Sequence, residues 1–148
     1  MSGWLLDTSI LSAFAPGGRA LAPRQARWFE RRSDQLYLSA VTAAEIEAGV
    51  RKLERARADR RARGLRAWFG RILELYGERV LPFDVKAAQA CGALTDAARA
   101  AGRDPGFADA AIAATAQAHG LTVLTANLRH FAELDVEASN PFGEEIQP

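Results

Sequence analysis

Three acidic residues stand at the ends of predicted secondary-structure elements. Asp7 follows the apolar run at residues 4–6, Glu45 lies in the first turn of the helix after the second strand, and Asp109 lies in the first turn of a later helix. In an α/β fold, strand ends and the starts of the following helices share one edge, where ligands bind. We therefore expect these carboxylates to lie close together. Their mutual repulsion would be relieved by a cation. Oxygen ligands without cysteine or histidine predict a hard ion, Mg²⁺ or Mn²⁺.

Polar residues also accompany these acids. Thr8 and Ser9 directly follow Asp7, and Asn127 lies just past the last good strand, two residues after Thr125. The end of that strand belongs to the same predicted edge of the sheet. We therefore expect Asn127 to join the acids there.

Each of these polar residues also has a purely structural explanation. Asp7 could be the N-cap of the helix that follows it, and Glu45 could complete a capping box with Thr42. Asp109 could complement the positive end of its helix dipole, and Asn127 could be a turn residue. The functional interpretation depends on the acids occupying equivalent ends of different elements.

Strands and helices alternate along the chain. The predicted strands cover residues 4–6, 36–38, 80–83 and 121–125, with a short last strand at Val136. The predicted helices cover residues 8–14, 24–32, 42–63, 65–76, 85–101, 107–118 and 128–134, with Gly64 breaking the third from the fourth. The fold class is thus α/β, a single domain whose central, mostly parallel sheet carries helices on both faces. The domain is expected to span residues 1–143, and residues 144–148 to form a flexible C-terminal tail.

The composition excludes several classes of protein. The 148 residues are 49% hydrophobic and 25% charged with a net charge of +1, which is typical of one soluble globular domain. Cys91 is the only cysteine, which excludes an intrachain disulfide and a cysteine-based zinc site, and two histidines are too few for a His-rich site. The sequence shows neither a signal peptide nor an apolar run of transmembrane length. We therefore predict a cytoplasmic protein.

One stretch of the chain is strongly basic. Residues 51–63 contain only two acids, Glu54 and Asp59, and many basic side chains, among them Arg51, Arg55, Arg57, Arg60 and Arg61. This stretch could be a solvated helical surface that keeps the protein soluble. It could equally be an electrostatic surface for phosphates or for an acidic partner.

The sequence resembles the PIN-domain ribonucleases of the VapC type, the toxin halves of bacterial and archaeal toxin–antitoxin pairs. The matching segments are LLDTS at 5–9, VTAAEIEAG at 41–49, ADAAIAATA at 108–116, LTANLRHF at 124–131 and NPF at 140–142. Each segment is weakly specific by itself. Together they occur in the family's order and cover almost the whole chain.

The resemblance implies a PIN-like fold and a set of site residues. The metal-binding and catalytic acids of the family correspond to Asp7, Glu45 and Asp109, and its fourth acidic position corresponds to Asn127. An asparagine can offer its carbonyl oxygen but brings no charge, so the number of metal ions stays open. Further polar positions that support the metal or its waters correspond to Thr8 or Ser9, and to Thr125.

The resemblance further implies an activity and partners. The activity is Mg²⁺- or Mn²⁺-dependent endoribonuclease cleavage of single-stranded RNA by a metal-activated water. The partners are a cognate antitoxin in the active-site groove and a second copy of the chain in a homodimer. The basic stretch would contact either RNA or the antitoxin.

Two alternatives compete with this interpretation. An acid after a buried strand also suits a phosphoaspartyl phosphatase, but such enzymes usually carry a second Asp two residues on, where this chain has Ser9. The other alternative is a catalytically weak PIN-like module that binds RNA or a partner protein without cutting, because Asn127 could weaken metal binding.

Overall fold

A five-stranded parallel sheet runs through the centre of the protein, of which the computed structural model describes residues 2–143. The strand order is β3-β2-β1-β4-β5, and all four neighbouring pairs are parallel. The strands are β1 (Trp4–Leu6), β2 (Leu36–Ser39), β3 (Val80–Leu81), β4 (Thr122–Leu124) and β5 (Ala138–Ser139). The apolar run at the start of the chain is the central strand, as predicted, and β3 is an edge strand.

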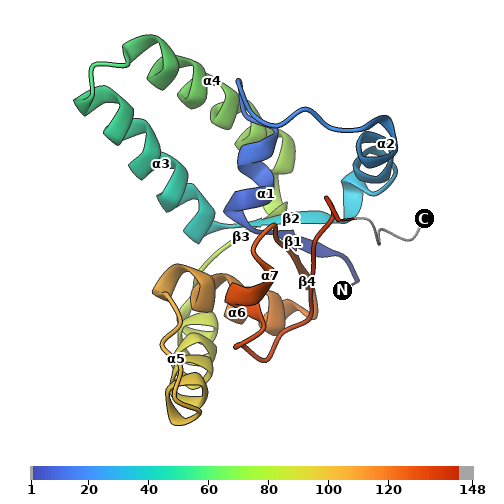
Figure 1. The fold of residues 1–148 in the computed structure, drawn as a ribbon, viewed down its shortest axis with the longest axis vertical. Coiled ribbons are helices and arrows are strands. Elements are labelled where there is room, and N and C mark those ends of the chain that lie inside the picture. Colours follow the sequence, from blue (N-terminus) through green and yellow to red (C-terminus); the bar gives the residue numbers. More distant parts are fainter. Residues whose placement is uncertain (1, 144–148) are drawn as a thin grey trace.

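Helices cover both faces of this sheet (Figure 1). Because successive strand residues point to opposite faces, Leu5 packs into one hydrophobic core and Leu6 into the other. On the Leu5 side lie α5 (Val85–Ala100), α6 (Phe107–His119) and α7 (Leu128–Phe131); on the Leu6 side lie α1 (Thr8–Ala13), α2 (Pro23–Arg31), α3 (Ala40–Arg55) and α4 (Asp59–Tyr76). Two short 3₁₀ turns, η1 (Ser33–Gln35) and η2 (Gly77–Arg79), precede β2 and β3. The predicted α/β class is confirmed.

The alanine-rich α6 is the most buried helix of the Leu5 side. Its residues 110–116 are all buried, because small side chains let the helix lie close against the sheet and α5. Gly120 ends the helix in the left-handed conformation, at φ 65°. The tight packing fixes the first turn of α6, which carries Asp109, at the edge of the sheet.

On the Leu6 side, α3 and α4 form a hairpin that projects from the body of the protein (Figure 1). The turn between them lies at Ala56–Ala58, where Arg57 has a φ of 58°. The prediction that Gly64 breaks the helix is wrong, since α4 runs through it. Glycine in a helix interior costs only about 1 kcal/mol, which does not by itself end a helix. Ion pairs from Arg66 to Glu47 (3.1 Å) and Glu54 (3.2 Å) join the two helices side by side.

The start of α3 also differs from the prediction. The helix begins at Ala40, and the side chain of Ser39 caps it by accepting from the Val41 N–H at 3.0 Å. The Thr42–Glu45 capping box is therefore wrong. Because Ser39 supplies the cap first, the side chains of Thr42 and Glu45 remain available for contacts outside the helix.

Most remaining boundaries lie within two residues of the prediction, but α7 ends at Phe131 rather than at residue 134. The last strand is at residues 138–139 rather than at Val136, and the predicted tail at 144–148 lies outside the described residues. Within residues 2–143, no helix has both the length and the apolar character that crossing a membrane requires.

Candidate metal centre

Asp7 stands at the carboxyl end of β1 and is nearly inaccessible, with 5% of its surface exposed. It is the N-cap of α1, with Oδ1 accepting from the Thr8 N–H at 2.8 Å. Its other oxygen, Oδ2, accepts from the hydroxyls of Ser9 and Thr125, both at 2.8 Å. The structural role considered for Asp7 is therefore real. It also fixes a buried carboxylate at the sheet edge.

The two hydroxyls that contact Asp7 are themselves oriented by the backbone after β4. The Ala126 N–H donates to Ser9 Oγ at 3.1 Å, and the Asn127 N–H donates to Thr125 Oγ1 at 3.0 Å. Each hydroxyl thus accepts from an amide and directs its hydrogen toward Asp7. Ser9 and Thr125 are placed as supporting residues for that carboxylate.

Asp109 lies in the first turn of α6, within range of the Asp7 charge. Burial raises the pKa of the Asp109 carboxyl, and the negative charge of Asp7 raises it further, whereas the neighbouring His130 lowers it. Two carboxylates close enough to repel in this way form a site whose free energy a divalent cation would lower. The donor set consists of hard oxygen atoms and fits Mg²⁺ or Mn²⁺.

Glu45 is connected to this pair through Thr8. The Thr8 hydroxyl donates to Glu45 Oε1 at 2.7 Å, and its Oγ1 lies 2.9 Å from the buried hydroxyl of Thr42. Since Thr8 has a single hydroxyl hydrogen, Thr42 must be the donor in the second bond. In the part of the chain that is described, no three Asp, Glu, His or Cys side chains converge as a metal-ligand group. The structure therefore places Asp109 within range of the Asp7 charge and connects Glu45 to Asp7 only through Thr8.

In the segment that follows β4, the structure differs from the prediction at two residues. Asn127 is exposed and precedes α7, and it contributes its backbone N–H to the network around Asp7. His130, in α7, was not predicted as a site residue, yet its Nδ1 lies 3.3 Å from Asp109 Oδ2. The available signal was its position three residues after Asn127.

A cavity of about 690 Å³ leads from Glu45 and Thr8 along the groove between α1, α3 and α4. Arg60 and Arg61 line it, and its apolar lining is supplied by Ile46, Leu53 and Leu65. Glycines 49 and 64 also line it, and a Cβ added at either would meet no atom within 4 Å. The groove is thus acidic at one end, basic at the other and open in between.

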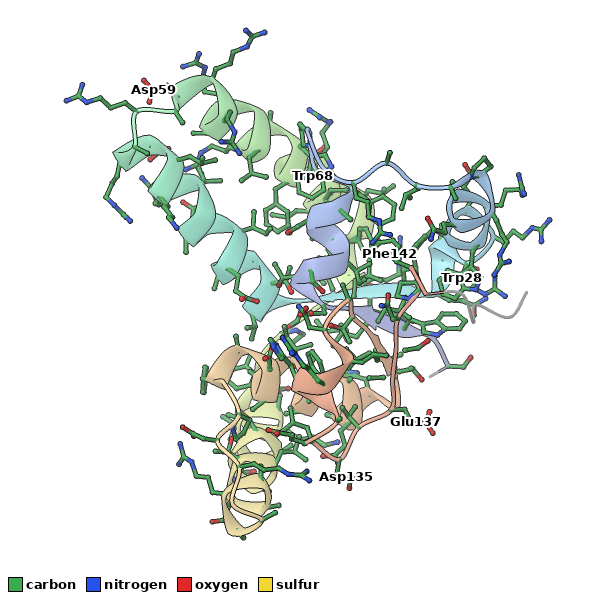
Figure 2. The ribbon with its side chains drawn as sticks, in the orientation of Figure 1. Trp28, Asp59, Trp68, Asp135, Glu137 and Phe142 are labelled. Carbon is green, nitrogen blue, oxygen red and sulfur yellow. The ribbon has the colours of Figure 1, made fainter. Side chains whose placement is uncertain are left out.

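The basic stretch divides into groups with different surroundings. Arg51 forms ion pairs with Glu47 at 2.9 Å and Glu54 at 3.6 Å, so it belongs to the hairpin's own network. Arg55 and Arg57 are exposed near the hairpin turn, outside the lining of the cavity. Around Asp59, at this end of the hairpin, side chains that end in nitrogen atoms extend away from the protein (Figure 2). Of the predicted arginines, Arg60 and Arg61 are the two that face the groove.

Comparison with known proteins decides the family. The model of the PIN domain matches residues 4–137. The chain belongs to the PIN-domain family. It is 34% identical over 141 residues to the VapC ribonuclease Y4jK of Sinorhizobium fredii, covering 93% of this chain and 96% of that one. It is 33% identical over 147 residues to Toxin FitB of Neisseria gonorrhoeae, covering 93% and 97%. Within the PIN-domain family, the chain is therefore of the VapC toxin type.

Solved structures agree with this assignment. The crystal structure of FitAcB from Neisseria gonorrhoeae superposes with a TM-score of 0.80 at 34% identity, covering 93% of this chain and 97% of that one. DNA-bound VapBC from Salmonella typhimurium superposes with a TM-score of 0.78 at 22% identity, covering 95% and 99%, and shows the shared fold. The PIN fold predicted from the sequence is confirmed.

Proposed function

We propose that this PIN-domain protein is the toxin of a toxin–antitoxin pair and an endoribonuclease that cleaves single-stranded RNA with Mg²⁺ or Mn²⁺. The observation that carries the proposal is the buried Asp7 carboxylate at the end of the central strand, held by the Thr8 N–H and by the hydroxyls of Ser9 and Thr125. Asp109 lies near enough for the negative charge of Asp7 to raise its pKa. The names of the relatives, VapC ribonuclease and Toxin FitB, support the same activity.

Each residue of the centre has a distinct task in this proposal. Asp7 and Asp109 would bind the cation, and Ser9 and Thr125 keep the Asp7 carboxylate in place. Glu45, oriented by Thr8, would complete the coordination or position the attacking water. A bound divalent cation supplies a water of lowered pKa and stabilises charge on the attacked phosphate.

Nothing among the described residues favours a covalent route. Cys91 is buried in α5, and burial raises the pKa of its thiol, which disfavours the nucleophilic thiolate. A phosphoaspartate on Asp7 is disfavoured because Ser9 stands where phosphoaspartyl enzymes usually carry a second Asp, and its hydroxyl donates to the Asp7 carboxylate. Hydrolysis by an activated water needs neither group.

The partners follow from the groove and from the relatives. Complexes named FitAB and VapBC are among the similar structures. For this chain we infer a protein antitoxin that shares the groove near Glu45 with RNA, and a homodimer. Exposed apolar side chains suited to such contacts are Leu73, Leu75, Val85, Phe107 and Leu128.

Removal of the two groove arginines should weaken RNA binding. In an Asp7→Asn background, which prevents cleavage, the double variant Arg60→Ala/Arg61→Ala is expected to lose about tenfold in RNA affinity at low salt. The slope of log affinity against log salt should fall by roughly 1–2, because each arginine displaces phosphate counterions. Fluorescence anisotropy with labelled single-stranded RNA measures both quantities.

The matched control is Arg55→Ala/Arg63→Ala, which removes the same charge from exposed positions on the same hairpin outside the cavity lining. It should retain most of the affinity. Equal losses in the two double variants would mean that the arginines form only a diffuse solvated surface.

Filling the groove without changing charge should also impair function. Gly64 lines the cavity and Gly70 does not, and at both positions a Cβ has open space. Glycine costs about 1 kcal/mol in a helix interior, so neither Gly64→Leu nor Gly70→Leu should destabilise the fold. We expect Gly64→Leu alone to reduce RNA cleavage by about tenfold or more, a loss of about 1.4 kcal/mol in transition-state stabilisation. Initial rates and thermal denaturation of both variants test this, and equal rates would exclude the groove as the RNA path.

The experiment that tests the proposed function is cleavage of a mixed single-stranded RNA pool by the purified, antitoxin-free chain. It is run with Mg²⁺, with Mn²⁺ and with EDTA, and Asp109→Asn controls for contaminating nucleases. Cleavage that requires metal and disappears in the variant supports the proposal. RNA binding without metal-dependent cleavage would replace it with the binding-module alternative.

A further inference from the structure

His130 is the one side chain in polar contact with Asp109 among the described residues, with Nδ1 3.3 Å from Oδ2. We propose that His130 is a positioning residue that keeps the Asp109 carboxylate turned toward Asp7 and thereby toward the metal. This inference rests on the proposed function, because it concerns the same centre.

The support for His130 is rigid. It lies on α7, whose last residue, Phe131, is fully buried in the core on the Leu5 side of the sheet. The His130 N–H also donates to the Asn127 carbonyl at 3.0 Å. The core therefore fixes one end of this short helix, and the segment whose N–H groups donate to Ser9 and Thr125 fixes the other. The imidazole of His130 is thereby held at a defined place.

The two oxygens of Asp109 have different surroundings. Oδ2 lies beside His130 and near Gly106, where an added Cβ would approach it to 3.9 Å. Oδ1 has no polar contact within residues 2–143, which leaves it available to a cation. The His130 contact with Oδ2 thus restrains rotation of the carboxylate.

Asp109 needs such a restraint because of its position in α6. It is the third residue of the helix, and the N-cap, Gly106, has no side chain with which to cap the first N–H groups. An acid in the first turn is attracted to those free N–H groups and to the positive end of the helix dipole. Asp109 Oδ2 already lies near the N-cap, Gly106, and without the His130 contact the carboxylate could turn fully onto the helix terminus.

The role requires only that Nδ1 carry a hydrogen that it can donate to Asp109 Oδ2. Partners that orient a metal ligand typically contribute 10–100-fold in metal affinity. His130→Ala is therefore expected to weaken Mn²⁺ binding by about 10–100-fold. His130→Asn, whose amide nitrogen can lie near the place of Nδ1, should restore most of the affinity.

The test is isothermal titration of the full chain with Mn²⁺, in the absence of RNA, for the wild type and for both His130 variants. His119→Ala is the control, since it removes the other histidine, at the far end of α6, and should bind like the wild type. Thermal denaturation confirms that each variant is folded.

Unchanged affinity in His130→Ala would overturn the positioning role while leaving the proposed nuclease intact. Tighter binding would also overturn it, since His130 would then compete with the metal for Asp109. A loss that His130→Asn does not recover would assign the effect to packing rather than to the donor. If the wild type binds no Mn²⁺, both this inference and the proposed metal centre fail.

Discussion

Replacing Asp7 with asparagine should lower the rate of RNA cleavage by about 10³-fold or more while leaving the fold intact, since a centre that loses its cation loses several kcal/mol of transition-state stabilisation. The substitution removes the charge of the most buried acid in the centre. The fold should persist because the amide oxygen can still accept from the Thr8 N–H. The hydroxyls of Ser9 and Thr125 can rotate to accept from the new NH₂ group.

Single-turnover cleavage rates and thermal denaturation of the wild type and Asp7→Asn measure both parts of this prediction. Asp96→Asn, an exposed acid on α5, is the control for loss of one carboxylate and should cleave normally. A fully active Asp7→Asn protein would refute the metal role. If Asp7→Asn were inactive because it is unfolded, the role of Asp7 as the N-cap of α1 would outweigh its role in the metal centre.

Asp109→Asn should abolish cleavage and at the same time stabilise the protein at neutral pH. Burial and the charge of Asp7 raise the pKa of Asp109 above its ordinary value of 3.8. The folded state therefore binds this proton more tightly than the unfolded state does, and stability falls as the pH rises through that window. At pH values above the raised pKa, the ionised Asp109 lowers the free energy of unfolding by a constant amount. An uncharged amide at this position removes that destabilisation.

The free energy of unfolding, measured by urea denaturation across the acid range, checks this sign. The gain of Asp109→Asn over the wild type should be present at neutral pH and should shrink as the pH falls toward 3.8, where the wild-type group binds its proton. A variant that is less stable at neutral pH would indicate that the His130 contact outweighs the repulsion from Asp7. The Asp7–Asp109 pair would then not be a strained centre.

The sequence was sufficient to predict elements whose residue types match their position in the fold. Trp4–Leu6 is apolar without interruption because β1 is the central strand, and Asp84 caps α5 as its type predicts. Asp7 shows that a structural and a functional interpretation can both hold, since one oxygen caps α1 and the other is fixed by Ser9 and Thr125.

The sequence was insufficient to predict features that depend on contacts between residues far apart in the chain. Thr42-x-x-Glu45 has the pattern of a capping box, but Ser39 begins the helix earlier, and Glu45 instead contacts Thr8 in α1. The turn between α3 and α4 forms at Ala56–Ala58, where Arg57 has a φ of 58°, and α4 runs through Gly64. His130 meets Asp109 only because α7 folds against the start of α6.

The central claim is that Asp7, Glu45 and Asp109 form a metal centre, and equilibrium titration with Mn²⁺ tests it most directly. The four proteins to compare are the wild type, Asp7→Asn, Glu45→Gln and Asp109→Asn, with Asp96→Asn as the control. We expect about one tightly bound ion per chain, an affinity about tenfold or more weaker in each of the three site variants, and no change in the control. If Glu45→Gln alone bound like the wild type, Glu45 would not be a ligand. If all five proteins bound Mn²⁺ equally, Asp7, Glu45 and Asp109 would not form a metal centre.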